Sequence, residues 1–197
     1  MTDWTSLTYV VVDVEGNGQH PPDLVELAAV PIVGGVIGQP VSWLVKPDAP
    51  ITGFARRIHG ITNEAVADAP AFTAIRDEVL AALNAAALVA HNAHVDLDVL
   101  SRKVGDWKPP EVFDTLKLAR RLLPDLGTYK LGTLVDAFHL ADGLPDGLTP
   151  HRANSDVLVT ARLFVRLAGL PDTRPLSLEE LRGQSPGGGH DETPALF

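Results

Sequence analysis

The sequence predicts an α/β domain, in which a mixed β-sheet carries helices on both of its faces. Three apolar segments come first, at residues 8–15, 24–33 and 36–45, and are expected to form antiparallel strands. After them, short apolar segments alternate with amphipathic helical patterns, an order typical of parallel strands joined by helices. A length of 197 residues, with 45% hydrophobic and 21% charged residues, fits one globular domain with a short appendage.

The first strand is expected at the centre of the sheet. Residues 8–15 are rich in β-branched residues and end in Asp13 and Glu15. Gly34 and Gly35 join the next two segments, because they can supply the positive φ angles of a two-residue hairpin. The sequence therefore predicts a buried strand that ends in carboxylates, followed by an antiparallel pair.

The remaining elements are predicted by hydrophobic periodicity and by helix-breaking residues. Between residues 70 and 83, apolar side chains recur with the spacing of one helical face. The helix that begins at Thr115 is expected to stop at Pro124, because proline lacks the N–H that a helix interior needs. In chain order, we expect helices at residues 70–83, from Ala93, at 115–123, 130–140 and 153–167, and short strands at 87–90 and 112–113.

The C-terminal part is expected to differ from the rest of the chain. We expect one domain over residues 1–170 and an appendage over residues 171–197. Ser177 and Glu180 have the spacing of a capping box, which predicts one short helix. Residues 183–197 contain three consecutive glycines and two prolines, so this tail is expected to be mobile.

Composition excludes several kinds of site. The chain has no cysteine, which excludes disulfides, thiolate metal ligands and a cysteine nucleophile. No apolar run approaches the length of a membrane span, and the N-terminus lacks a signal-peptide pattern, so a cytoplasmic protein without membrane contact is expected. The formal net charge of −9 disfavours a protein that grips duplex DNA with clustered cations, unless bound metal ions neutralise gathered carboxylates.

Asp13 and Glu15 form the first candidate metal site. Residues two apart in a strand project to the same side of the sheet, so both carboxylates face one way. Paired carboxylates suit a hard cation such as Mg²⁺ or Mn²⁺. With 25 acidic residues such pairs also arise by chance, and a surface turn is the alternative. The apolar strand leading into them favours the metal site, because burying unpaired carboxylates is costly.

The other candidate catalytic residues are Asp96, Asp156 and His151. Asp96 lies in the first turn of a predicted helix, where it or Asp98 alternatively stabilises the helix dipole. Asp156 lies one turn into the last predicted helix. His151 reaches the same side only from a loop, since residues five apart in a helix point about 140° away from each other. Pro150 favours that loop, although a lone histidine there is otherwise an ordinary surface residue.

Three motifs in order resemble those of the DEDDh-type 3′-to-5′ exonucleases, the superfamily of the proofreading subunit of bacterial replicative polymerase, RNase T and oligoribonuclease. Asp-Val-Glu-Gly-Asn-Gly at residues 13–18 is similar to the first motif, Ala-His-Asn-Ala-His-Val-Asp at 90–96 to the second, and His-Arg-Ala-Asn-Ser-Asp at 151–156 to the third. Three linking segments also fit in order and spacing, at residues 58–62, 113–124 and 129–131. The resemblance extends from residue 8 to residue 168.

The resemblance implies that the predicted domain is an exonuclease domain with a ribonuclease-H-like fold, a mixed five-stranded sheet flanked by helices. It implies hydrolysis of phosphodiester bonds at the 3′ end of DNA or RNA with two metal ions, Mg²⁺ or Mn²⁺, and release of nucleoside 5′-monophosphates. It also implies that Asp13 is a ligand shared by both ions and that His151 takes a proton from the attacking water. The implied metal ligands are Asp13, Glu15, Asp96 and Asp156.

Two positions depart from the family's pattern, and both are on the substrate side. Gly16 stands where many members have threonine, so only a backbone N–H remains for the terminal sugar. Val95 stands where phenylalanine is usual, which removes an aromatic ring that could pack against the end nucleotide. The expected substrate-binding residues are Val14, Gly16, His59 and Asn92, of which His59 and Asn92 alternatively brace the backbone.

Several functional alternatives remain. A catalytically silent module of the same fold, which binds nucleic-acid ends or acts as a polymerase-partner subunit, is one, and a nuclease that cuts internally is another. Residues 193–197 are slightly similar to peptides that bind the bacterial sliding clamp, the alternative being a frayed terminus. DNA and RNA are not distinguished. Seven cations either follow a nucleic-acid backbone or form a solvated face: Arg102, Lys103, Lys108, Lys117, Arg120, Arg121 and Lys130.

Overall fold

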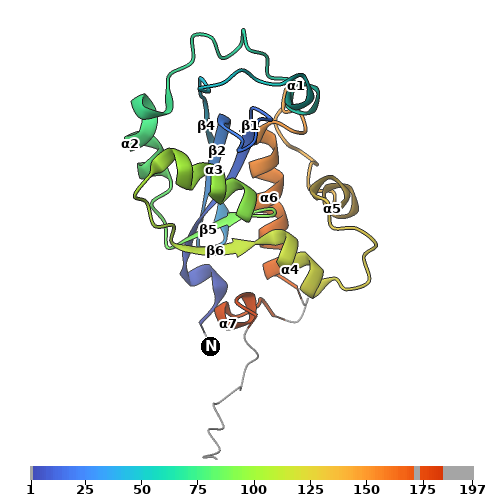
Figure 1. Cartoon of the computed structure of the whole chain (residues 1–197). Helices are drawn as coiled ribbons and strands as arrows, with labels where there is room; N and C mark the ends of the chain where they lie inside the picture. Colours follow the sequence, from blue (N-terminus) through green and yellow to red (C-terminus); the bar gives the residue numbers. More distant parts are fainter. Residues whose placement is uncertain (1, 171–173, 184–197) are drawn as a thin grey trace, which may run out of the picture.

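Six strands form one mixed sheet in the computed structural model, which describes residues 2–170 and 174–183 (Figure 1). The order along the sheet is β3-β2-β1-β5-β6, and β4 also pairs with β2. β2 is antiparallel to β1, whereas β5 and β6 continue the sheet in parallel. The strands are β1 (Thr8–Gly16), β2 (Leu24–Val33), β3 (Val36–Ile37), β4 (Val41–Leu44), β5 (Ala87–Ala90) and β6 (Glu111–Asp114).

Seven α-helices occur among the described residues, and every predicted helix is present. The helices are α1 (Gly53–His59), α2 (Phe72–Ala82), α3 (His94–Val104), α4 (Thr115–Leu122), α5 (Leu131–Phe138), α6 (Ala153–Ala168) and α7 (Leu178–Leu181). None of the helices described is long and apolar enough to cross a membrane.

The sheet has a hydrophobic core on each face, because alternate residues of its central strands project to opposite sides. Tyr9 and Val11 of β1 pack in one core with Phe164 of α6. Val10 and Val12 belong to the other core, which includes residues of α2 and α3. Helices therefore cover both faces of the sheet, as the sequence predicts.

The segment predicted as one strand at residues 36–45 forms two strands, which gives a sheet of six strands where five were expected. β3 ends at Ile37, and β4 begins at Val41. Pro40 lies between them and has no N–H to donate to a strand ladder. Both short strands still pair antiparallel with β2.

The helix α1 is not predicted from the sequence, and neither is the 3₁₀ turn Trp4–Ser6. The side chain of Thr52 caps α1 by accepting a hydrogen bond from the Ala55 N–H at 3.2 Å, and the helix ends at Gly60 with φ 74°. Only Ala55 and His59 of this helix are buried. Two buried residues in seven give no amphipathic pattern to detect.

The predicted capping box at the C-terminal side is confirmed. The Ser177 side chain accepts a hydrogen bond from Glu180 N at 3.2 Å, and a Glu180 carboxylate oxygen accepts one from Ser177 N at 2.7 Å. Leu178 and Leu181 of α7 pack in the same core as Trp4. The predicted mobile tail, apart from residue 183, and the clamp-like peptide at 193–197 lie outside the described residues, and the domain division stays a prediction.

The C-terminal end of β1 is the point where the candidate site is assembled (Figure 1). The β1–β2 ladder runs up to the pair Glu15 and Glu26, and its register shifts between Glu15 and Gly16. Because β5 is parallel to β1, its C-terminal end lies at the same edge of the sheet. The chain leaving β5 enters α3, so Asp96 in the first turn of α3 lies at the same edge of the sheet as Asp13 and Glu15.

Candidate active site

Three predicted metal ligands lie together at the end of the central strand. Asp13 and Glu15 belong to β1, and Asp156 belongs to the first turn of α6. One carboxylate oxygen from each of the three lies within 4.8 Å of the other two. The structure thus brings together residues separated by more than half of the chain.

Asp96 lies beside this carboxylate cluster and is held by the strand that carries it. Its side chain is 5% exposed and lies in the first turn of α3. One carboxylate oxygen of Asp96 accepts a hydrogen bond from the backbone N–H of Val14 at 3.1 Å. Asp98, which the sequence gives together with Asp96 as a possible helix-dipole residue, is exposed and forms an ion pair with Arg102. Asp96 is thus the aspartate of α3 that is placed next to the site.

The four carboxyl groups resist carrying their charges together. Burial, followed by the charge of Asp96, raises the pKa of Asp13 well above its usual range. Burial and the charge of Asp156 raise the pKa of Glu15 to about 8, and burial raises the pKa of Asp96 to about 7. Burial also raises the pKa of Asp156. A bound cation would reverse this balance, because it favours the charged form of each carboxyl group.

The donor set fits a divalent metal ion. The cluster of Asp13, Glu15 and Asp156 offers carboxylate oxygens alone, which are the donors that hard cations prefer. Burial and neighbouring charges raise the pKa values of these three carboxyl groups, and a divalent cation would stabilise their charged forms. This acidic cluster therefore supports the use of a divalent metal.

His151 lies in the turn that leads into α6, as its predicted role requires. It is exposed, and its backbone has φ 62°. Its backbone N–H donates to an Asp156 carboxylate oxygen at 3.3 Å. His151, Ser155 and Asp156 line one side of a cavity of about 940 Å³, whose other walls come from α5 and residues 141–150. His151 therefore lines a cavity that also reaches a predicted metal ligand, Asp156.

The predicted substrate-binding residues are largely engaged with the backbone. His59 is buried, its Nδ1 accepts a hydrogen bond from Ile61 N at 3.0 Å, and its Nε2 lies 3.2 Å from the carbonyl oxygen of Gly16. Nε2 therefore carries the proton and donates to Gly16. Burial lowers the pKa of His59, which favours this neutral ring. These contacts support the bracing role for His59.

Asn92 also braces a turn near the site. Its φ of 67° is in the left-handed region, which asparagine tolerates better than most residues. Its backbone N–H donates to a carboxylate oxygen of Asp114, the residue that caps α4, at 3.1 Å. Asn92 lines a second cavity of about 600 Å³ together with Arg120 and Lys130. The backbone contact supports the bracing role of Asn92, and its substrate-binding role stays a prediction.

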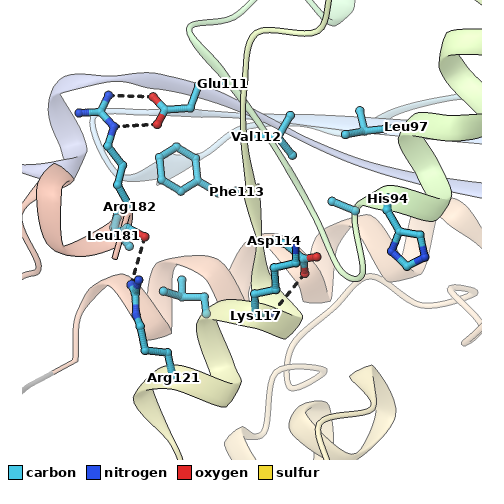
Figure 2. Close-up of a pocket in the computed structure, with 12 residues that line it drawn as sticks. His94, Leu97, Glu111, Val112, Phe113, Asp114, Lys117, Arg121, Leu181 and Arg182 are labelled. Carbon is cyan, nitrogen blue, oxygen red and sulfur yellow. Dashed lines mark hydrogen bonds and ion pairs between the residues drawn. The ribbon is translucent and has the colours of Figure 1, made fainter. Parts of the chain in front are cut away.

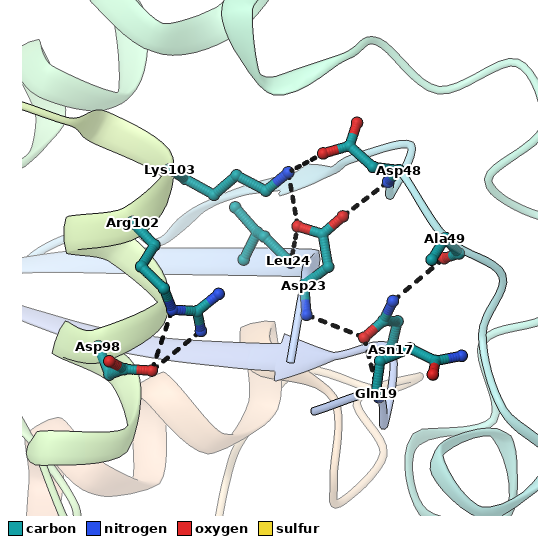
Figure 3. A network of polar contacts seen from close by, with 9 residues as sticks. All are labelled: Asn17, Gln19, Asp23, Leu24, Asp48, Ala49, Asp98, Arg102 and Lys103. Carbon is teal, nitrogen blue, oxygen red and sulfur yellow. Dashed lines mark hydrogen bonds and ion pairs between the residues drawn. The ribbon is translucent and has the colours of Figure 1, made fainter. Parts of the chain in front are cut away.

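A polar network fixes the loop that follows Glu15 (Figure 3). The buried Asn17 side chain accepts hydrogen bonds from Gln19 N at 3.1 Å and Asp23 N at 2.8 Å, and donates to Ala49 O at 3.1 Å. The side chain of Asp23 in turn forms an ion pair with Lys103 of α3. The network joins this loop to two other segments and so limits its freedom beside the cluster.

The cations between residues 102 and 130 do not form one continuous track. Arg102 and Lys103 are engaged by neighbouring aspartates. Arg121 donates to the carbonyl oxygens of Glu180 and Leu181 at 2.6 and 3.1 Å. Arg121 also lines a cavity of about 730 Å³ beside β6 (Figure 2), which none of the predicted catalytic residues lines. Part of this cationic segment therefore has a structural role.

Three features beside the site are not predicted from the sequence. Glu26 of β2 is buried and bound by Arg152, next to His151. The sequence feature that could have indicated Glu26 is that it is the single charged residue in an otherwise apolar strand. Phe54 and Ile58 of α1 are 65% and 45% exposed. Their helix packs on the loop after Glu15, since a Cβ added to Gly18 would lie 2.9 Å from the Ala55 side chain.

The comparison with protein families gives a match over most of the chain. The family model described as Exonuclease matches residues 10–164. The 3′-5′ exonuclease DinG of Bacillus subtilis (strain 168) is 35% identical over 166 residues, which are 81% of this chain and 17% of DinG. Exodeoxyribonuclease 10 of Escherichia coli (strain K12) is 38% identical over 155 residues, which are 79% of this chain and 66% of that protein. The chain thus spans only part of these relatives.

Solved structures agree with this match. The structure described as Exonuclease X in complex with 5′ overhanging duplex DNA is 33% identical, with a TM-score of 0.72 over 88% of this chain and 98% of that one. The nuclease domain of 3′hExo, described as a DEDDh family member bound to rAMP, has a TM-score of 0.67 at 18% identity, over 86% of this chain and 94% of that one, and so shows the fold alone. The predicted ribonuclease-H-like fold and the predicted membership of an exonuclease family are confirmed. With a family match from residue 10 to residue 164, the chain belongs to the exonuclease family.

Proposed function

We propose that this chain is a metal-dependent exonuclease that removes nucleotides from the 3′ end of DNA and releases nucleoside 5′-monophosphates. The observation that carries the proposal is the cluster of Asp13, Glu15 and Asp156, whose carboxylate oxygens lie within 4.8 Å of one another at the end of β1. Asp96 and His151 lie beside it. Membership of the exonuclease family gives this cluster its chemical context.

The four acidic residues would hold two ions, Mg²⁺ or Mn²⁺, as the resemblance to DEDDh exonucleases implies. Asp13 is the most suitable shared ligand, because the charges of all three other acidic residues raise its pKa. Bound divalent ions would lower the pKa of a water molecule and stabilise the negative charge on the reacting phosphate. Val14 contributes through its backbone, since its N–H orients the Asp96 carboxylate.

His151 would act as the general base. Its exposed ring can accept a proton from a water molecule, whose oxygen then bonds to phosphorus while the bond from phosphorus to the 3′ oxygen breaks. The 3′ oxygen leaves on the shortened strand and takes up a proton, so the terminal nucleotide departs with a 5′-phosphate. Histidine suits this step because a neutral imidazole has one ring nitrogen that can accept a proton.

DNA is the proposed substrate on the basis of the relatives. One relative is named exodeoxyribonuclease 10, and the related exonuclease X is described in complex with duplex DNA that has a 5′ overhang. A duplex with a 5′ overhang has a recessed 3′ end, which is one kind of 3′ end that the proposed enzyme could shorten. A cytoplasmic location fits such a substrate and stays a prediction.

Association with a polymerase is proposed on a narrower basis. One relative, described as DNA polymerase III PolC-type, is 34% identical over 81% of this chain but extends far beyond it, since the match covers 11% of that protein. Copurification of the full chain with a replicative polymerase and its sliding clamp tests this contact. Equal recovery with and without Leu196 and Phe197 would end the clamp-peptide interpretation.

The activity is tested with a DNA duplex that carries a radioactive phosphate on its 3′-terminal internucleotide linkage. The proposal predicts that the label leaves as a nucleoside 5′-monophosphate in the first turnover, with Mg²⁺ or Mn²⁺ present. A duplex with a blocked 3′ hydroxyl and the Asp156→Asn variant are the controls, and both should retain the label. Labelled fragments of several nucleotides would indicate internal cutting, and binding without release would indicate the silent module.

A further inference from the structure

Glu26 is a buried acid in the middle of an apolar strand. Its side chain is 2% exposed, and it lies directly across the β1–β2 ladder from Glu15. An isolated carboxylate in this place would be strongly destabilising, because neighbouring acids repel it and water cannot solvate it. A specific set of partners must therefore compensate its charge.

Those partners come from the start of α6. Arg152 Nε and Nη2 donate to the two carboxylate oxygens of Glu26 at 2.9 and 2.6 Å, which is a two-bond ion pair. The backbone N–H of Ala153, the first residue of α6, donates to Glu26 at 2.9 Å. Arg152 occupies the N-cap position of α6, and its own side chain makes no capping hydrogen bond. Glu26 thus performs from β2 the role of a helix N-cap.

We propose that Glu26 and Arg152 are positioning residues, which set the distance between the metal-binding strand β1 and the N-terminal end of α6. This inference rests on the proposed function. Arg152 follows His151 directly, and Asp156 lies one turn beyond it. Since Glu26 pairs across the ladder with Glu15, one ion pair connects the strand with the turn that carries His151 and with the helix that carries Asp156.

The local backbone explains why such a connection is needed. His151 has φ 62°, in a region that costs energy for residues other than glycine, and its backbone N–H donates to an Asp156 carboxylate oxygen at 3.3 Å. The bonds of Glu26 to Arg152 and Ala153 clamp the two residues that follow. A loss of the clamp would therefore move His151 without removing any ligand or the base itself.

Three variants separate positioning from simple stabilisation: Arg152→Lys, Arg152→Met and the double variant Glu26→Leu with Arg152→Met. Arg182→Lys is the matched control, because Arg182 forms a comparable two-bond pair with Glu111 at 2.7 and 2.8 Å on strand β6. The measurements are kcat and KM on single-stranded DNA with Mn²⁺, the melting temperature, and amide hydrogen exchange of residues 151–157 without metal.

Arg152→Met should lower both the melting temperature and kcat, because it leaves Glu26 buried without a partner. The double variant should have a melting temperature close to that of the wild type, since no unpaired charge remains. Its kcat should still be about 10- to 100-fold below that of the wild type, with little change in KM. Its amides at 153–157 should exchange faster than those of the wild type. Arg152→Lys should give an intermediate kcat, because lysine keeps the charge but not the fork of donors.

A double variant with wild-type kcat would overturn the proposal. A loss of kcat in Arg182→Lys equal to that in Arg152→Lys would also overturn it. Absence of cleavage by the wild type would instead refute the proposed function. In that case hydrogen exchange alone decides: faster exchange at residues 153–157 in the double variant supports positioning, and unchanged exchange overturns it.

Discussion

Val14 and Asp96 are joined by a hydrogen bond across 82 positions of the chain, from the Val14 backbone N–H to an Asp96 carboxylate oxygen at 3.1 Å. Val14 lies between Asp13 and Glu15, so this bond sets α3 against the strand that carries two of the proposed ligands. The same bond opposes the effect of burial on the pKa of Asp96, which still stands at about 7. Asp96 is therefore both anchored and available for a cation.

Asp96→Asn should keep the bond to Val14 and remove the charge. We expect kcat to fall about 100-fold or more, the scale of losing one strong electrostatic contribution to the transition state, while the melting temperature without metal stays the same or rises. The control is Asp98→Asn two residues away, whose side chain is exposed and pairs with Arg102. Steady-state kinetics checks the prediction, and comparable activity in the two variants would remove Asp96 from the site.

His151→Asn is the sharpest test of the general base. Asparagine tolerates the positive φ of 62° at this position, so the variant removes the imidazole with little backbone strain. We expect kcat to fall about 10²- to 10⁴-fold, with Mn²⁺ affinity unchanged. His139→Asn is the matched control, because His139 is an exposed histidine with φ 54° at the end of α5. A weaker Mn²⁺ affinity in His151→Asn would instead make His151 a metal ligand.

The stability of the metal-free protein should fall as pH rises. In the folded state Glu15 and Asp96 keep their protons up to about pH 8 and about pH 7, whereas an unfolded chain releases them near pH 4. Between these limits the folded state binds more protons than the unfolded state, so the unfolding free energy decreases with pH. A melting-temperature series in EDTA measures this slope.

Added Mn²⁺ should oppose that loss, and its stabilising effect should grow from about pH 5 to about pH 8 as it displaces protons from the carboxylates. The variant Glu15→Gln with Asp96→Asn should show a shallower slope in EDTA, because two of the titrating groups are gone. An identical slope in that variant would assign the pH dependence to other groups.

Phe54 is expected to contact the unpaired bases of the substrate. It is 65% exposed on α1. Its ring is a candidate replacement for the phenylalanine ring that is missing at position 95, where this chain has valine. Phe54→Ala should raise KM for single-stranded DNA about 5- to 150-fold, the equivalent of about 1–3 kcal/mol of base stacking, with kcat nearly unchanged. Val36→Ala is the control, since Val36 is 71% exposed on β3. Equal KM values for the two variants would exclude the contact.

Local patterns predict most of the fold, because the elements that decide it are strongly periodic. The strand at residues 8–15 and the helix at 153–167 are found nearly as predicted, as both bury long apolar stripes. The helix α1 is missed because Phe54 and Ile58 face outward. The split of residues 36–45 depends on where Pro40 falls in the ladder, which strand length alone does not determine.

The acidic cluster could be predicted because strand alternation and the order of motifs both indicate it. The sequence could not show that Asp13, Glu15 and Asp156 lie within 4.8 Å of one another, since this distance depends on how α6 docks on the sheet. Nor could it show the partner of Glu26, which lies 126 positions away at Arg152. Such long-range contacts are set by tertiary packing, and local propensity does not encode them.

The most direct test of the central claim is the cleavage of 5′-labelled single-stranded DNA in the presence of Mn²⁺ by the wild type and by Asp13→Asn. The account predicts a ladder of products that shortens from the free 3′ end with the wild type. It predicts no cleavage with Asp13→Asn, because this variant lacks the carboxylate that is proposed to bind both ions. A ladder of equal intensity from Asp13→Asn, or products that begin at internal positions, would contradict it.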